Sequence, residues 1–129
     1  MSHMEHTQAL RANTQVHFNC FQSVVVPFAK ELGLTQEQAY ALGAHFGSGM
    51  RHGATCGALS GALLVLGGLG YDEHQAAQFI RDFRESHGAT DCATLLKASH
   101  DRGEVKKEHC DGLVYEMVQA LDALLEQKG

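Results

Sequence analysis

The chain has 129 residues, of which 44% are hydrophobic and 19% are charged, and its formal net charge at pH 7 is −5. This length predicts a single domain that is large enough to bury a core. The negative charge and the lack of a basic cluster argue against nucleic acid as a partner. The longest apolar segment, GALLVLGGLG, is too short to span a membrane, and no secretory signal is recognisable.

The first residues, MSHM, are interpreted as the remnant of an expression tag. Residues 1–4 are therefore set apart from one domain over residues 5–129, and His3 is given no role. Strand signals are nearly absent, because β-branched residues do not alternate with polar ones outside the short segment SVVVPF. We expect an all-α fold, a compact bundle of about five to six helices.

The first predicted helix covers residues 7–26. Its apolar residues recur every four positions and so share one buried face: Val16, Cys20 and Val24. Pro27 is expected to break or kink this helix, because proline cannot donate the backbone hydrogen bond.

The next two helices are predicted from their caps. Thr35 and Gln38 form a capping-box pattern, and the helix that they begin is expected to end near Phe46. The glycine-rich segment GSGMRHGAT should then turn the chain. A third helix is expected to start near Thr55, which can cap it, and to end at residues 67–68.

The second half of the chain predicts three more helices. Asp72 caps EHQAAQFIRDFRESH, which Gly88 ends, and Thr90 or Asp91 caps a shorter segment, CATLLKAS. The last helix is expected over residues 105–127. Its buried face consists of Cys110, Leu113, Val114, Met117, Leu121, Leu124 and Leu125.

Four cysteines, Cys20, Cys56, Cys92 and Cys110, stand at spacings of 36, 36 and 18 residues, without a CxxC pair. This is not the pattern of a disulfide-stapled secreted domain, so we expect a bacterial-type cytoplasmic protein that keeps thiols for redox or metal chemistry. Cys56 and Cys92 fall in the first turns of predicted helices, where the helix dipole favours a thiolate and lowers the pKa. The alternative is packing alone, because free cysteine is among the most buried residue types.

Small residues surround Cys56 in the segment GATCGALSGA. Gly57, Ala58 and Gly61 would form a strip without bulk, against which another helix can pack closely. Such an approach can bring a second cysteine within the roughly 4.4–6.8 Å between Cα atoms that a disulfide needs. Strips of this kind also serve helix packing alone, so both interpretations stay open.

Four segments resemble, in this order, the blocks of a bacterial and archaeal family: NCFQSVVVPFAKELGL, HFGSGMRHGATCGALSGALLVLG, FIRDFRESHGATDC and CDGLVYEMVQALDALLE. It is the C_GCAxxG_C_C family of redox-active proteins, named after its four cysteines. The resemblance spans about Asn19 to Glu126, all four cysteines match, and CGALSG fits the CGAxxG element. It implies a small helical domain with redox activity at its cysteines, without a settled reaction.

The same resemblance implies a cofactor in some relatives. A similar module occurs in split-Soret cytochromes, where an iron–sulfur centre accompanies haem. This chain has no CxxCH motif, which argues against covalent c-type haem. It departs from the family pattern at His45 and His52, which flank the glycine-rich turn, and at Pro27, which interrupts a helix that the family commonly continues.

The first hypothesis for the function is a redox-active protein that uses its thiols for disulfide exchange or electron transfer. The four cysteines are its candidate catalytic residues, and an unidentified redox protein is its partner. Cys56 would be the nucleophile, activated by its helix end and by Arg51 or His52, and a second cysteine would resolve the intermediate. Four cysteines allow three pairings, among which the sequence does not choose. Cys56→Ser is expected to abolish the chemistry with little loss of fold.

The second hypothesis makes the same four cysteines ligands of an iron–sulfur cluster or a zinc ion, because soft thiolates select these centres. His45 and His52 are further candidate ligands, and the strip Gly57, Ala58 and Gly61 is the candidate cofactor-binding surface. The third hypothesis is a non-catalytic homodimeric interaction module.

Overall fold

A computed structural model describes residues 2–128, and this part of the chain contains seven α-helices, one 3-10 helix (η1) and one wide turn (η2). The all-α prediction is confirmed, but the helices outnumber the five to six expected. Between residues 2 and 128 the only β-type pairing is an isolated bridge that joins Thr55 to Asp91. In chain order the elements are α1 (His3–Ala12), α2 (Cys20–Val25), η1 (Val26–Phe28), α3 (Gln36–Leu42), η2 (Gly49–Gly53), α4 (Gly57–Gly68), α5 (Glu73–His87), α6 (Cys92–Asp101) and α7 (Lys106–Lys128).

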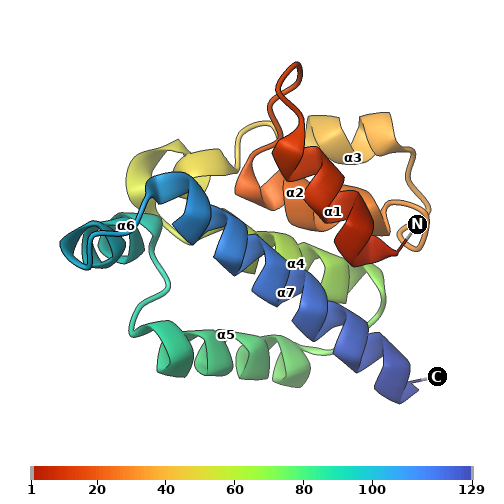
Figure 1. Cartoon of the computed structure of the whole chain (residues 1–129). Helices are drawn as coiled ribbons and strands as arrows, with labels where there is room; N and C mark the ends of the chain where they lie inside the picture. The colour runs from red at the N-terminus through yellow and green to blue at the C-terminus, as the bar shows by residue number, and fades with distance from the viewer. Residues whose placement is uncertain (1, 129) are drawn as a thin grey trace.

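Helices α2, α4 and α7 form the centre of the fold, where each packs against the other two. In Figure 1 the long helix α7 runs diagonally across the molecule, with α1 to α3 on one side and α5 on the other. Helix α1 packs on α7 and α5 packs on α4, while α6 contacts the turn η2 and α7. The central helices thus carry the core, and the others cover it.

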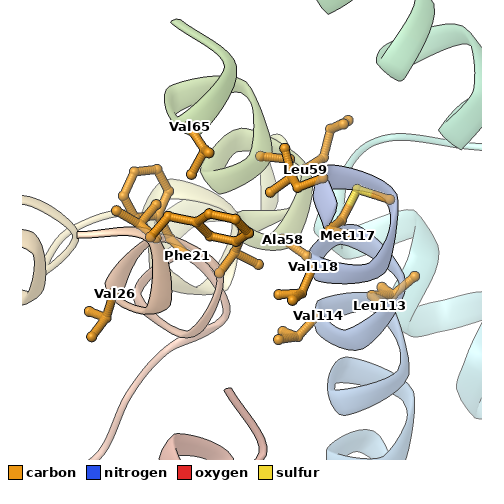
Figure 2. Close-up of a cluster of buried hydrophobic side chains, with 14 of the residues drawn as sticks. Phe21, Val26, Ala58, Leu59, Val65, Leu113, Val114, Met117 and Val118 are labelled. Carbon is orange, nitrogen blue, oxygen red and sulfur yellow. The ribbon is translucent and has the colours of Figure 1, made fainter. Parts of the chain in front are cut away.

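The apolar core fills the space between the three central helices, as Figure 2 shows. Helix α2 contributes Phe21, α4 contributes Leu59 and Val65, and α7 contributes Val114 and Val118, all at most 2% exposed. Burying one such side chain stabilises a fold by about 1.5–3 kcal/mol. The alternation of large side chains with small ones lets these helices lie close together.

The predicted close-packing strip of α4 faces α2. A Cβ atom on Gly61 would lie 3.1 Å from the carbonyl oxygen of Phe21 and 3.2 Å from the Cβ of Val24. Few real Cβ atoms lie this close to a neighbour. The two helices can therefore pack at this short distance because residue 61 is a glycine.

The predicted helix over residues 7–26 is wrong, because the chain leaves the helix at Asn13. The side-chain oxygen of Asn13 accepts hydrogen bonds from the backbone N–H groups of Gln15 and Val16, both at 2.9 Å. Asparagine offers the backbone this local alternative to a helix. Val16 is 43% exposed, so it does not belong to the buried face.

A new helix, α2, begins after this turn. Asn19 accepts a hydrogen bond from the N–H of Gln22, whose side chain accepts one from the N–H of Asn19, and this capping box makes Cys20 the first helical residue. The predicted break at Pro27 is confirmed, since this proline lies in the 3-10 helix η1 that ends α2.

Caps set most of the remaining boundaries. The capping box of Thr35 and Gln38, the N-cap Asp72 and the left-handed C-cap Gly88 are confirmed, and Asp91 is the N-cap of α6. Helix α7 starts one residue later than predicted, with most of its expected apolar face buried. No helix in the described part of the chain is long and apolar enough to cross a membrane.

Two boundaries differ from the prediction. Helix α3 ends at Leu42 rather than near Phe46, because the chain passes into tight turns after Gly43. The N-cap of α4 is Cys56 rather than Thr55, whose backbone lies in the bridge to α6. The second difference matters for the site, since it places a thiol at the very start of α4.

The residues that were interpreted as a tag remnant are part of α1. Ser2 caps the helix, and the imidazole of His3 bonds to Asp122 Oδ1 at 2.6 Å and to Glu31 Oε1 at 2.8 Å. Met1 lies outside the described residues. The division into residues 1–4 and 5–129 stays a prediction.

Candidate functional site

All four cysteines line one cavity of about 170 Å³. Cys20 begins α2, Cys56 caps α4, Cys92 begins α6, and Cys110 lies one turn into α7. Residues that are up to 90 positions apart in the sequence are therefore gathered by the starts of four helices. All four are free thiols.

Cys20 and Cys110 are in direct contact, because the thiol of Cys20 hydrogen-bonds to the sulfur of Cys110. Gly57 allows the start of α4 to lie beside this pair. A Cβ atom on Gly57 would lie 3.2 Å from the Cβ of Cys20 and 3.1 Å from the backbone nitrogen of Phe21. The glycine after Cys56 thus gives clearance to the neighbouring cysteine.

Cys56 and Cys92 are held by their backbones at the bridge between α4 and α6. The N–H of Cys56 donates to the carbonyl of Thr90 at 2.8 Å, and the N–H of Cys92 donates to the carbonyl of Ala54 at 2.7 Å. These bonds fix the backbones of both cysteines at the two ends of the bridge.

The turn η2 lies against the start of α6, close to Cys92. Ser48, Met50 and Arg51 have φ angles of 53°, 57° and 68°, which form a left-handed turn that non-glycine residues rarely adopt. Gly49 is required in it, because a Cβ atom there would lie 2.8 Å from the Cβ of Cys92. Ser48 and Gly49 line the cavity. Backbone strain of this kind is concentrated at functional sites in proteins.

The charges around the cavity favour a thiolate at Cys110. The hydrogen bond from Cys20 lowers the pKa of Cys110 to about 7; burial opposes this effect, and the cations Arg11 and Lys106 reinforce it. The same hydrogen bond and burial raise the pKa of Cys20. Arg11 is fixed in place, since its Nε donates to Asp111 Oδ1 at 2.6 Å. At neutral pH, therefore, Cys110 is about half in the thiolate form, while Cys20 stays a thiol.

Burial raises the pKa of Cys56 and of Cys92. Cys56 is 4% exposed. Hydrogen bonds from the backbone N–H groups of Leu59 and Ala58 lower its pKa, but burial raises the pKa by more. The expected lowering at these two helix starts is therefore wrong, because loss of solvent outweighs the helix end. Whether either cysteine is catalytic stays a prediction.

The side chains expected to assist Cys56 lie elsewhere. Arg51 Nε donates to His45 Nδ1 at 3.0 Å, and these two residues and His52 are exposed and do not line the cavity. The role of His45 and His52 as metal ligands stays a prediction. Among residues 2–128, no group of three or more His, Cys, Asp or Glu is arranged to hold a single metal ion.

Four basic side chains that line the cavity were not identified from the sequence: Arg11, His17, Lys106 and His109. The two cations give no sequence signal, because they come from the ends of helices far from most of the cysteines. His109 directly precedes Cys110 in α7, and its side chain is only 8% exposed. Its Nδ1 lies 3.7 Å from Glu104 Oε1, and burial lowers its pKa. Its position beside a cysteine was the signal that could have identified it.

The family described as "Putative redox-active protein (C_GCAxxG_C_C)" has a model that matches residues 18–124. The chain belongs to this family. The match covers all four cysteines and the strip of small residues after Cys56, so the resemblance in the sequence is confirmed. Neither the search of curated proteins nor the search of solved structures found a match.

Proposed function

We propose that the protein performs reversible thiol–disulfide exchange at Cys20 and Cys110. The observation that carries this proposal is the hydrogen bond between the two sulfurs at the wall of a cavity, which lowers the pKa of Cys110. A thiolate is the species that attacks disulfides, and the best attacking thiols have a pKa near the ambient pH. Cys110, with a pKa of about 7, meets this condition.

In the oxidising direction the Cys110 thiolate attacks one sulfur of a substrate disulfide. The bond between the two substrate sulfurs breaks, the first substrate thiolate leaves and takes a proton from solvent, and a mixed disulfide forms at Cys110. Cys20 then loses its proton and attacks the Cys110 sulfur, which releases the second substrate thiolate. Two electrons pass from the two cysteines to the substrate disulfide, and the protein keeps a Cys20–Cys110 disulfide.

The other groups of the cavity have supporting roles in this proposal. Arg11 and Lys106 stabilise the thiolate that forms at Cys110 when the disulfide is reduced. Cys56 and Cys92, whose backbones are fixed by hydrogen bonds at the bridge, form a second wall of the cavity and do not take part in the first exchange.

The proposal is tested by treating the fully reduced protein with an excess of a linear disulfide, oxidised glutathione, blocking the remaining thiols and mapping linked peptides by mass spectrometry. The expected product joins the peptides of Cys20 and Cys110. Cys110→Ser should prevent it, whereas the matched variant Cys92→Ser should not. A first link between Cys56 and Cys92, or four free thiols after treatment, would contradict the proposal.

A second candidate is an iron–sulfur protein, which is favoured by one observation: four soft sulfur donors line the same cavity. The donor chemistry fits a cluster better than one zinc ion, because zinc needs all four sulfurs at about 2.3 Å from a single point. A bound cluster would supply one-electron transfer, and the four cysteines would hold it. Reconstitution with iron and sulfide without oxygen should then give colour and bound iron that Cys20→Ser removes.

The homodimer, the redox partner protein and the cytoplasmic location stay predictions. A cytoplasmic location agrees with the proposed exchange, because glutathione and thioredoxin systems keep thiols reduced there.

A further inference from the structure

A second cavity adjoins the cysteine cavity, and its lining is basic. Its volume is about 280 Å³, and its walls come from the end of α1, the loop after it and the start of α7. It shares Arg11, His17, Lys106 and Cys110 with the cysteine cavity, whereas Lys107 lines only the second cavity. No acidic residue of the described chain is part of this lining. We call it the basic cavity, and Cys110 lies at its wall.

The two lysines of the basic cavity lie one turn before Cys110 in α7. Lys106 precedes Cys110 by four residues and Lys107 precedes it by three. Residues at these spacings are neighbours on a helix surface, about 5–6 Å apart at their Cβ atoms. Arg11 joins them from α1, because its Nε donates to Asp111 Oδ1 at 2.6 Å, next to Cys110 in the sequence. Three cations are therefore grouped around this cysteine.

The basic cavity is positive, although the chain as a whole carries a formal net charge of −5. Asp111 pairs with both Arg11 and Lys107, at 2.6 Å and 2.9 Å, so these three side chains carry one net positive charge. Lys106 forms no ion pair within residues 2–128 and adds a second positive charge. A local charge opposite in sign to that of the whole molecule raises the concentration of anions at the cavity.

The cations of the basic cavity keep capacity for a ligand. The side chain of Arg11 is only 10% exposed, and its Nε and Nη1 donate to Asp111 and to the carbonyl of Phe18. Its Nη2 bonds to none of residues 2–128 and is not buried, so it is an available donor. Glu104 and Glu108, the acids nearest to Lys106 in the sequence, line a different cavity. Arginine and lysine at such a place bind carboxylates through charge-assisted hydrogen bonds.

We propose that the disulfides exchanged at Cys110 are those of small acidic thiols, and that Arg11, Lys106 and Lys107 hold a carboxylate of the substrate in the basic cavity. This inference rests on the proposed function, since it names the substrate class of the same exchange. The carboxylate takes no part in the electron transfer and only positions the disulfide. A short carbon chain between carboxylate and sulfur matches the one-turn spacing of the lysines from Cys110. The cavity is at the lower end of the about 300–1,000 Å³ found for ligand sites, so the substrate is small.

The first test measures charge preference at Cys110 without any disulfide. Fully reduced protein is alkylated without oxygen by iodoacetate, which carries a carboxylate, or by iodoacetamide, which is neutral and of similar size. Peptide mass spectrometry follows the modification of Cys110. The ratio of the two rates is divided by the same ratio for 2-mercaptoethanol, a neutral thiol. The normalised ratio should be about fivefold above one at low salt. It should approach one in 1 M salt, where the Debye length is about 3 Å.

Matched lysine variants locate the charge that is responsible. Lys107→Gln should lower the normalised ratio about twofold. Lys107 is not among the causes of the lowered pKa of Cys110, and the ratio does not depend on how much thiolate is present. Lys97→Gln is the control, because Lys97 also pairs with an aspartate four residues further on, at 4.0 Å from Asp101, but lines neither cavity. It should leave the ratio unchanged.

The second test measures exchange with three linear disulfides of different charge. They are 3,3′-dithiodipropionate, which is anionic, 2-hydroxyethyl disulfide, which is neutral, and cystamine, which is cationic. Each rate of thiol release is divided by the rate with 2-mercaptoethanol as the attacking thiol, which removes differences in intrinsic reactivity. The normalised rates should fall in the order anionic, neutral, cationic.

The outcomes separate this inference from the proposed function. A normalised alkylation ratio near one, or equal effects of Lys107→Gln and Lys97→Gln, would overturn the inference whether or not the protein exchanges disulfides. Exchange rates that do not depend on substrate charge would also overturn it. No reaction with any of the three disulfides would contradict the proposed function and the substrate class with it, and the alkylation ratio would still show whether the cavity prefers anions.

Discussion

The cavity has two walls, which hold their cysteines in different ways. On one wall Cys20 and Cys110 touch through their side chains, next to two cations. On the other, Cys56 and Cys92 are fixed through backbone hydrogen bonds at the bridge between α4 and α6. Only the first wall has a cysteine with a lowered pKa.

The difference between the walls shows that a helix start is not enough to make a reactive thiol. Cys56 caps α4, yet burial raises its pKa. Cys110 lies a turn inside α7, and its pKa falls because a neighbouring thiol donates to it and Arg11 and Lys106 are near. Direct partners outweigh the helix dipole, which is worth only about 0.3–1 kcal/mol at an exposed helix end.

The difference between the two walls is tested most directly by exchanging one cysteine on each wall for serine. Cys110→Ser should abolish the reaction with a small disulfide, because no thiolate remains to attack it. Cys56→Ser should leave the reaction in place and keep the fold, since serine is itself a good N-cap. The rate at which substrate thiol is released measures both effects.

This outcome would reverse the expectation that the sequence raised for Cys56→Ser. If Cys56→Ser lost the reaction while Cys110→Ser kept it, the attacking thiolate would be Cys56 and not Cys110. A variant with both cysteines replaced supplies the background rate.

The contact between the walls depends on Gly57. Gly57→Val should lower the free energy of unfolding by about 1–3 kcal/mol, because the new atoms crowd Cys20 and the backbone of Phe21. The matched change Gly112→Ala, where a Cβ atom has open space in a helix, should raise it by about 1 kcal/mol. Urea unfolding of both variants measures the difference. Equal stability of Gly57→Val and the unaltered protein would contradict the close approach of α4 to α2.

The lowered pKa of Cys110 should depend on Cys20, its hydrogen-bond partner. Cys20→Ala removes the largest cause of the lowering, so the pKa should rise from about 7 toward the ordinary 9.0. The pH dependence of alkylation at Cys110 measures this pKa. Cys92→Ala is the control and should leave it in place, since no effect of Cys92 on Cys110 contributes to the lowering.

The same pair predicts how stability changes with pH. An unfolded cysteine has a pKa of about 8.5, so the lowered pKa of Cys110 stabilises the folded protein above this value and less as the pH falls through 7. The raised pKa of Cys20 acts in the opposite sense, and its contribution is lost above about pH 8.5. The pair's contribution should therefore rise from pH 7 to about 8.5 and then decline, and Cys20→Ala should remove both the rise and the decline, because it also returns the pKa of Cys110 toward its ordinary value.

The smallest expected effects concern two capping boxes. Thr35→Ala should cost about 1 kcal/mol of stability, as N-caps usually do. Asn19→Ala should cost more, because the Nδ2 of Asn19 also donates to the carbonyl of Gly43 at 2.9 Å. Thermal unfolding measures both losses, and the iodoacetamide reactivity of Cys110 should change only in Asn19→Ala. Unchanged reactivity there would show that the start of α2 does not position Cys20.

Local rules predicted much of the helical frame. Thr35, Asp72, Gly88 and Asp91 were recognised because a cap acts through side chains and backbone only a few residues apart. The break at Asn13 was missed because the period-four apolar pattern of Val16, Cys20 and Val24 runs through the non-helical segment that follows it. At that point a side-chain hydrogen bond to the backbone competes with the helix, and the pattern alone does not show which prevails.

The candidate site was predictable in its residues and not in its geometry. The four cysteines were identified, but their convergence depends on how α2, α4, α6 and α7 pack. The contact of Cys20 with Cys110 spans 90 positions of sequence, and no local rule reaches that far. His109 was overlooked because an abundance of histidines says nothing about which of them is buried.

The acidity of Cys110 also makes the thiol a reporter on folding itself. In an unfolded chain at pH 7 a cysteine with a pKa of about 8.5 is ionised to only a few per cent, whereas the folded Cys110, with a pKa of about 7, is about half ionised. The chain thus gains its nucleophile only when its last helix docks, after every other cysteine has left the ribosome. A nascent or misfolded copy would react slowly with alkylating reagents, and labelling speed would distinguish mature molecules from immature ones.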